Sequence, residues 1–143
     1  MNQFSNVLRE YRKWILSIPF VNILLPFALY ILFGSIAVDF LCKLTYTIFP
    51  RIYAYGIYSV ISFLDSFAYF GFWIGFWLIL VTKDMKLAPY ALFANVFVFL
   101  FPFTSFSLFS VLKAAIFIWL GYLLLKFTAS SSYSEINERE ITV

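Results

Sequence analysis

The chain has no histidine and only one cysteine among its 143 residues. It therefore lacks the commonest metal ligand and the side chain that most often serves as a general base near neutral pH. A lone cysteine, Cys42, excludes an internal disulfide and any paired-cysteine metal or redox motif. The chain also has no glycine-rich phosphate loop and no nucleophile elbow. We expect no catalytic site, no metal and no cofactor.

Charge is equally scarce. Charged residues make up 12% of the chain, against 64% hydrophobic and 24% aromatic residues. A soluble domain carries about 25% charged residues, and a small chain cannot bury so much apolar surface. The net charge of +3 comes from basic residues that flank apolar segments, so no nucleic-acid partner is expected. The composition predicts an all-α integral membrane protein, embedded in the lipid bilayer of a cytoplasmic (plasma) membrane.

Four apolar segments are candidates for transmembrane helices, with spans at about 14–38, 61–82, 87–103 and 108–128. At 1.5 Å per residue the first would be about 37 Å long, enough to cross a core of about 30 Å with some tilt. It far exceeds the apolar core of a signal peptide, so we expect it to be retained. Pro19 and Pro26 are expected to bend it, because each removes a backbone donor. Residues 1–128 form a single four-helix domain in this interpretation, and 129–143 a disordered polar cytoplasmic tail.

The N-terminal residues 1–13 have apolar side chains at helical spacings of three and four, at Phe4, Val7, Leu8 and Tyr11. This pattern favours a short helix in the headgroup plane, with its basic side toward anionic lipid. A frayed basic terminus that flanks the first span is the alternative.

Orientation follows from the basic residues of short flanking segments. With the N-terminus inside, six of them fall on the cytoplasmic side: Arg9, Arg12, Lys13, Lys83, Lys86 and Lys126. Only Lys43 and Arg51 fall outside, in a predicted loop over residues 39–51. The bias predicts that both termini are cytoplasmic. In that loop Asp39 and Lys43 lie four residues apart and are interpreted as a weak surface pair.

Two charges, Asp65 and Lys113, lie within predicted spans, where charge is costly. A second helix that starts near Ser62 would place Asp65 in its first turn, by the outer headgroups. A start at Ile52 would place it about midway. Three hypotheses remain open: each charge reaches the interface alone, with Lys113 snorkelling along its stem; the two form an ion pair; or they line a proton or ion site.

Four residues are candidates for helix packing. Gly71 and Gly75 form a small-x-x-x-small pattern that lets helices approach closely, within the bundle or between protein chains. Asn22 and Asn95 are amides expected at membrane depth in the first and third spans, where they need partners on other helices or on backbone carbonyls.

In the tail, residues 133–136 match the Tyr-x-x-apolar pattern that eukaryotic sorting adaptors read. The pattern is short, and whether it is a true sorting motif stays open.

The sequence favours a small multi-pass protein that acts as a non-catalytic accessory or interaction subunit, assembled with itself or with a larger membrane complex. The alternative is a small oligomeric transporter or channel with Asp65 and Lys113 in its pathway. A third class, an enzyme acting on lipid, would need a cluster of polar groups at one interface. Only four residues could supply that cluster: Asp39, Lys43, Arg51 and Asp65.

Overall fold

The computed structural model describes residues 2–49, 57–103 and 107–130, and every regular element in them is a helix. The elements are α1 (Asn2–Leu16), α2 (Pro19–Leu24), the 3-10 helix η1 (Leu25–Phe27), α3 (Ala28–Ile48), α4 (Ile57–Ile79), the 3-10 helix η3 (Lys83–Leu87), α5 (Ala88–Leu100) and α6 (Leu108–Thr128). The predicted helical class and the short N-terminal helix are confirmed.

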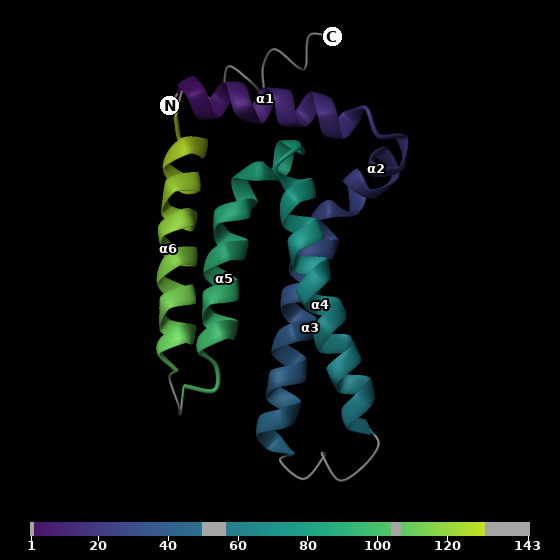
Figure 1. Cartoon of the computed structure of the whole chain (residues 1–143), viewed down its shortest axis with the longest axis vertical. Coiled ribbons are helices and arrows are strands. Elements are labelled where there is room, and N and C mark those ends of the chain that lie inside the picture. The colour runs from purple at the N-terminus through teal and green to yellow at the C-terminus, as the bar shows by residue number, and fades with distance from the viewer. Residues whose placement is uncertain (1, 50–56, 104–106, 131–143) are drawn as a thin grey trace.

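The long helices form two hairpins beneath a helix that lies across them (Figure 1). Helix α3 packs along α4, α5 packs along α6, and α3 also contacts α5. Helices α4 and α6 run toward α1, whereas α3 and α5 run away from it (Figure 1). The described ends of α1 and α6 lie at the same end of the molecule, which we call the α1 end.

Three helical segments are long and apolar enough to cross a bilayer: Pro19–Ile48, Ile57–Ile79 and Leu108–Thr128. They make the chain a multi-pass membrane protein. Helix α5, in the position of the predicted span 87–103, has only 13 residues and is about 20 Å long, short of the roughly 20 residues that a crossing needs. Three of the four predicted spans thus correspond to helical segments of sufficient length, and the third predicted span does not.

The first span differs from its predicted bounds at both ends. It begins at Pro19 rather than at Trp14, because the residue before a proline avoids helical geometry and Ile18 is extended. Pro26 lies in the 3-10 segment between α2 and α3, so both prolines stand where the chain departs from a straight α-helix. Helix α3 then continues to Ile48, through most of the segment predicted as a loop.

Helix α1 is fastened to the bundle rather than lying free at the membrane surface. Arg12 is only 2% exposed, and its Nε and one terminal nitrogen donate to the carbonyls of Leu80 and Thr82, each at 3.3 Å. These carbonyls follow the C-terminus of α4, where helical carbonyls lack internal donors. Tyr11 donates to the Trp77 carbonyl at 3.2 Å, and burial raises the pKa of its phenol, which keeps it protonated. The sequence pattern predicted that the basic side of this helix faces lipid headgroups. Arg12 instead faces the bundle.

The tightest packing lies between this end and the middle of the bundle. Leu32, Ile79 and Met85 have no exposed surface. A Cβ built on Gly75 would lie 2.6 Å from the backbone nitrogen of Leu32, and one built on Gly71 would meet the Ser35 hydroxyl. The two glycines thus face α3 of the same chain, which brings the backbones of α3 and α4 into close contact.

Candidate functional site

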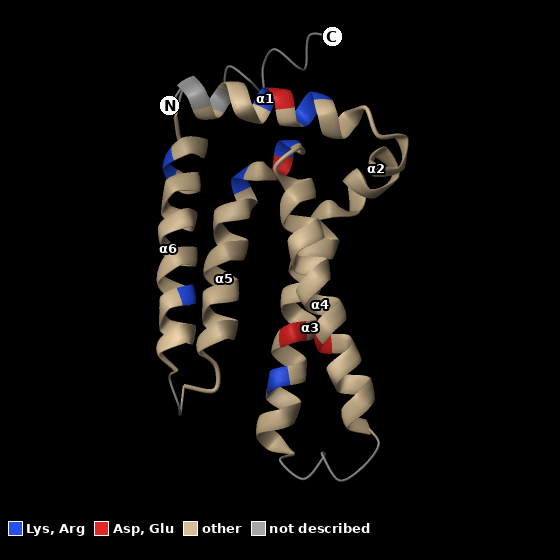
Figure 2. Ribbon diagram, in the orientation of Figure 1, with Lys and Arg blue, Asp and Glu red and all other residues tan. Residues whose placement is uncertain are grey.

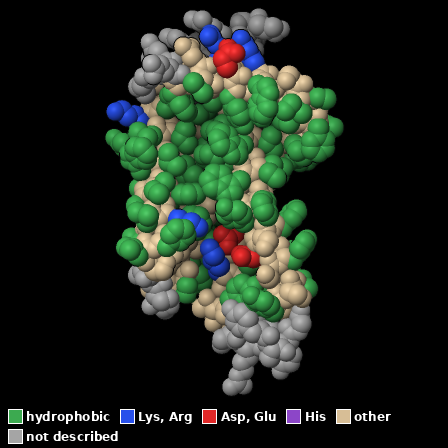
Figure 3. Space-filling view, in the orientation of Figure 1, with side chains coloured by type: hydrophobic (Ala, Val, Ile, Leu, Met, Phe, Trp, Pro, Cys, Tyr) green, Lys and Arg blue, Asp and Glu red, His purple; other side chains and the backbone are tan. Residues whose placement is uncertain are grey.

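The half of the bundle away from α1 contains charged side chains among apolar ones. In Figure 2 the charged residues of α3 and α4, and one of the two basic residues of α6, lie in that half, well separated from the charged residues of α1 and η3. The space-filling view shows basic and acidic groups gathered there, at the seam between the two hairpins (Figure 3). Charge at this depth of a membrane protein is costly unless it is paired or used.

A cavity of about 60 Å³ lies at this seam, which we call the polar cavity. All four long helices contribute to its wall, with the residues Ser35, Ile36, Asp39, Ala68, Tyr69, Phe72, Trp73, Asn95, Phe99, Lys113 and Phe117. Six of these carry polar groups: Ser35, Asp39, Asn95 and Lys113, together with the phenol of Tyr69 and the indole N–H of Trp73.

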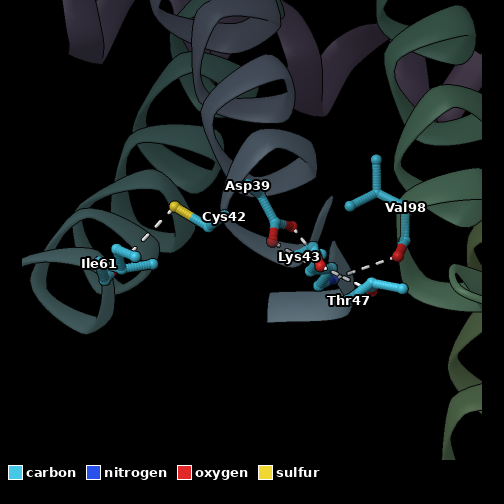
Figure 4. A network of polar contacts seen from close by, with 6 residues as sticks. All are labelled: Asp39, Cys42, Lys43, Thr47, Ile61 and Val98. Atoms are coloured by element: carbon cyan, nitrogen blue, oxygen red, sulfur yellow. Dashed lines mark hydrogen bonds and ion pairs between the residues drawn. The ribbon is translucent and has the colours of Figure 1, made fainter. Parts of the chain in front are cut away.

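On α3, Asp39 and Lys43 form an ion pair, with Lys43 Nζ 3.3 Å and 3.4 Å from the two carboxylate oxygens (Figure 4). Lys43 also donates to the carbonyl of Val98 on α5 at 3.2 Å. That carbonyl lacks its helical donor because the residue four positions on is Pro102, which has no N–H. The Asp39 side chain is 19% exposed and the Lys43 side chain 30%. The expected weak surface pair is therefore a partly buried link between the two hairpins.

Asp65 lies farther along its helix than expected. Helix α4 begins at Ile57, so Asp65 is about 12 Å from its start rather than in its first turn. The side chain is partly buried, and its carboxyl group is close enough to that of Asp39 to interact with it electrostatically. Two carboxylates therefore meet across α3 and α4, and Lys43 pairs with one of them.

Lys113 of α6 lines the polar cavity, held between aromatic rings. Its Nζ lies 4.8 Å from the ring centre of Phe109 and 5.5 Å from that of Phe99. Among the described residues, neither Lys113 nor Asp65 forms an ion pair, so the pair considered from the sequence is absent there. Both charges nonetheless lie at the same seam, as residues of a shared pathway or binding site would.

The two asparagines differ in position. Asn22 is exposed near the corner between α1 and α2, where its amide nitrogen is 3.5 Å from the Leu16 carbonyl, and not at membrane depth. Asn95 is 4% exposed and lines the polar cavity. Within the part of the chain that the structure describes, its side chain has no hydrogen-bond partner, contrary to the expectation that it would bond to another helix.

Cys42 lies on the other side of the ion pair, in the interface between α3 and α4. It is 4% exposed, and its thiol sulfur is 3.9 Å from the Ile61 carbonyl (Figure 4). The described residues contain no group of three or more His, Cys, Asp or Glu side chains suited to a metal ion.

From the sequence, Asp39 and Lys43 were considered only as a weak surface pair and as members of an interfacial cluster, and not as part of a site with Asn95 and Lys113. Two signals could have found them: an apolar stretch continues on both sides of the pair, and Ser35, Asp39 and Lys43 repeat every four residues, which puts them on one helix face. Arg51 and the tail pattern at residues 133–136 lie outside the described residues. Asp39, Lys43 and Asp65, three of the four residues considered for an interfacial cluster, lie close together and partly buried at the α3–α4 side of the seam.

No protein family, curated protein or solved structure matches this chain. Its function must therefore be argued from the geometry of the polar cavity and of the helices around it.

Proposed function

We propose that the chain crosses the bilayer four times, with α5 as the third crossing. The direction of the helices supports this: α4 and α6 run the same way, so the chain between them has to return across the membrane (Figure 1). Helix α5 makes that return. Its shortness is tolerable because one side of it is buried against its neighbours, including Ala91, Leu92 and Val96.

Both termini are cytoplasmic in this proposal. The basic residues of α1, η3 and the end of α6 gather at the α1 end, the arrangement expected of a cytoplasmic face (Figure 2). Lys43, which the sequence analysis had counted on the opposite side, lies within α3 and no longer counts against this orientation. A reporter fused after residue 143 should be protected from reagents added outside intact cells, and labelling from outside would contradict the orientation.

Within this topology the chain acts as a non-catalytic accessory or interaction subunit of the plasma membrane. One observation carries the proposal: in the described residues the polar cavity is separated from the α1 end by fully buried apolar side chains such as Leu32, Ile79 and Met85. A single chain thus lacks a polar route across the membrane. Its partly exposed charges at the seam are suited to contact with a second membrane protein or another copy of the chain.

Site-specific photocrosslinking tests this role. A photoreactive residue in place of Tyr69, which is 55% exposed and lines the polar cavity, should crosslink to a partner membrane protein in native membranes. Tyr122 on α6, 57% exposed and outside that lining, is the matched control and should crosslink weakly. Equal crosslinking from both positions, or none from either, would contradict the proposal.

A small oligomeric transporter or channel is the second candidate, and the polar cavity itself favours it. Asp39, Asn95 and Lys113 line one space inside the bundle, and Asp65 adjoins it, as groups in an ion or proton pathway do. In this case the purified chain alone should conduct ions or protons in liposomes. Loss of that flux in both Asp65→Asn and Lys113→Gln would favour transport over the accessory role.

A further inference from the structure

The polar cavity contains hydrogen-bonding groups that the protein itself leaves unused. The Asn95 side chain is only 4% exposed, yet its amide has no hydrogen-bond partner in the described part of the chain. Every fully sealed side-chain nitrogen or oxygen there does have a partner. The Asn95 amide must therefore border the cavity, where a bound molecule could reach it. A buried amide without a partner costs stability, so its presence calls for a ligand or water.

The α6 wall of the polar cavity carries a positive charge that no carboxylate in the described residues compensates. Lys113 is partly buried between the rings of Phe99 and Phe109, and no carboxylate of a described residue lies within ion-pair distance. The rings attract the ammonium group and hold it in place, but they do not neutralise it.

Asp39 lines the same cavity from α3, and Asp65 of α4 adjoins Asp39 without lining the cavity itself. Asp39 and Asp65 meet across α3 and α4, and only Lys43 pairs with them, through Asp39. Because Lys43 also donates to the Val98 carbonyl, its position is set by α5 as well. The four charges sum to zero, yet they are divided, with an excess carboxylate on the α3–α4 side and an unpaired ammonium group on α6.

The volume limits the ligand. A site for one water needs at least about 10–15 Å³ of such space, so about 60 Å³ accommodates roughly four to six atoms or groups of that size. An isolated cation of this size would face Lys113, and an isolated anion would face the two carboxylates. A small zwitterion meets both walls with opposite charge.

We propose that the polar cavity binds a zwitterion of the size of glycine. Its ammonium group lies on the side of Asp39 and Asp65, and its carboxylate is bound by Lys113 and by the amide of Asn95. The rings of Phe72, Trp73 and Phe117 close the space around its single carbon and exclude a long side chain. The inference goes beyond the proposed function, since the chain could bind this ligand as an accessory subunit or as a transporter.

Binding is tested with the purified full chain in lipid nanodiscs, and glycine is the probe. A ligand that binds only the folded state raises the midpoint of thermal unfolding as its concentration rises. Glycine should raise the midpoint in a saturable way, whereas methylamine and acetate at the same concentrations should not. Leucine should bind at least about tenfold more weakly than glycine, because its side chain exceeds the space. If glycine has no effect, the cavity holds water only and the proposal is wrong.

Variants identify the site. Lys113→Gln and Asn95→Ala should each weaken glycine binding by at least about tenfold, since a hydrogen bond to a charged group is worth more than that factor. Lys126→Gln is the matched control: Lys126 is an exposed basic residue on the same helix, outside the cavity lining, and its loss should leave glycine affinity unchanged.

Two outcomes would overturn the assignment. Equal weakening by Lys126→Gln would indicate a general charge effect and not a site. Binding of acetate as strong as that of glycine would indicate an anion site in which Asp39 and Asp65 play no part. If Lys113→Gln fails to accumulate, Asn95→Ala, which changes no charge, supplies the same comparison.

Discussion

At the α1 end of the bundle a buried cation donates hydrogen bonds to backbone carbonyls. In the opposite half, two charged groups have no partner of opposite charge among the described residues, and an amide has no hydrogen-bond partner there. Arg12, 2% exposed, donates to carbonyls just beyond α4 and so fastens α1 to the bundle. Lys113, Asp65 and Asn95 lie around the polar cavity without an ion pair among the described residues, and Asp65 interacts with the like carboxyl group of Asp39. Because unpaired polar groups in a membrane cost stability, we propose that Arg12 is kept for folding, whereas the unpaired groups at the polar cavity are kept for binding.

Lys43 belongs to both categories. It caps the α5 carbonyl that Pro102 leaves without a donor, as Arg12 does for α4, and it also pairs with Asp39 beside the polar cavity. Substitutions at these positions should therefore have effects on stability that decrease from the packed α1 end toward the cavity.

The largest loss is expected for Gly75→Leu, in the closely packed region. Its side chain would run into the backbone of Leu32, and overpacking typically costs about 1–3 kcal/mol or more. The midpoint of thermal unfolding in detergent should fall strongly. Gly34→Leu is the control, because a Cβ there meets nothing within 4 Å. If the double variant Gly71→Leu, Gly75→Leu instead stays folded and only its oligomer dissociates, the glycines pack between chains and not against α3.

Arg12→Met should come next. It removes the donor to the Leu80 carbonyl and one of the two donors to the Thr82 carbonyl, which keeps the Met85 N–H, and a buried polar group left without its partner costs about 1–3 kcal/mol. The unfolding midpoint should fall, and α1 should become accessible to protease. Arg9→Met, an exposed basic residue on the same helix, should have little effect. Equal effects of the two variants would show that α1 is held by general charge attraction and not by Arg12.

These two positions also show what the sequence could and could not predict. Hydropathy and length gave the membrane class and three of the helices, since a crossing requires about 20 apolar residues whatever the neighbours are. The role of Arg12 depends on a contact with a residue 68 positions away, and no local pattern encodes it. The start of α4 was misplaced because the second span was assigned only the roughly 20 residues that a crossing needs, which gave a start near Ser62, whereas α4 begins at Ile57.

The same limit applies to the polar cavity. Asp39 and Lys43 were assigned to a loop because charges usually end an apolar run, but in the structure their pairing and the Val98 carbonyl let α3 continue. Asp65 and Lys113 were selected from their cost in a membrane, which is a local property. That they share a seam with Asp39 and Asn95 depends on how the two hairpins pack, which the sequence pattern does not specify.

A smaller loss is expected for Lys43→Met. The substitution removes a partly exposed ion pair and one helix-end hydrogen bond, and it leaves Asp39 and Asp65 facing each other without compensation. We expect a cost of about 1–2 kcal/mol, below that of Arg12→Met, because 30% of the Lys43 side chain is exposed. Adding Asp39→Asn should restore part of the stability in a double-mutant cycle, whereas adding Asp84→Asn, an exposed acid at the α1 end, should restore none.

Asp65→Asn should change stability least, by no more than about 0.5 kcal/mol. Its carboxyl group has no ion pair in the described residues and interacts with the like group of Asp39, so neutralising it removes repulsion and breaks no ion pair. An asparagine amide at this position can also donate a hydrogen bond to the Asp39 carboxylate. Asp39→Asn, at the neighbouring position, is the matched comparison and should be the more damaging variant, because it breaks the pair with Lys43. The thermal midpoint and the amount of folded protein in the membrane measure both. Loss of Asp65→Asn from the membrane, rescued by Lys113→Gln, would mean that these two charges pair after all, and that the unused groups of the polar cavity serve folding rather than binding.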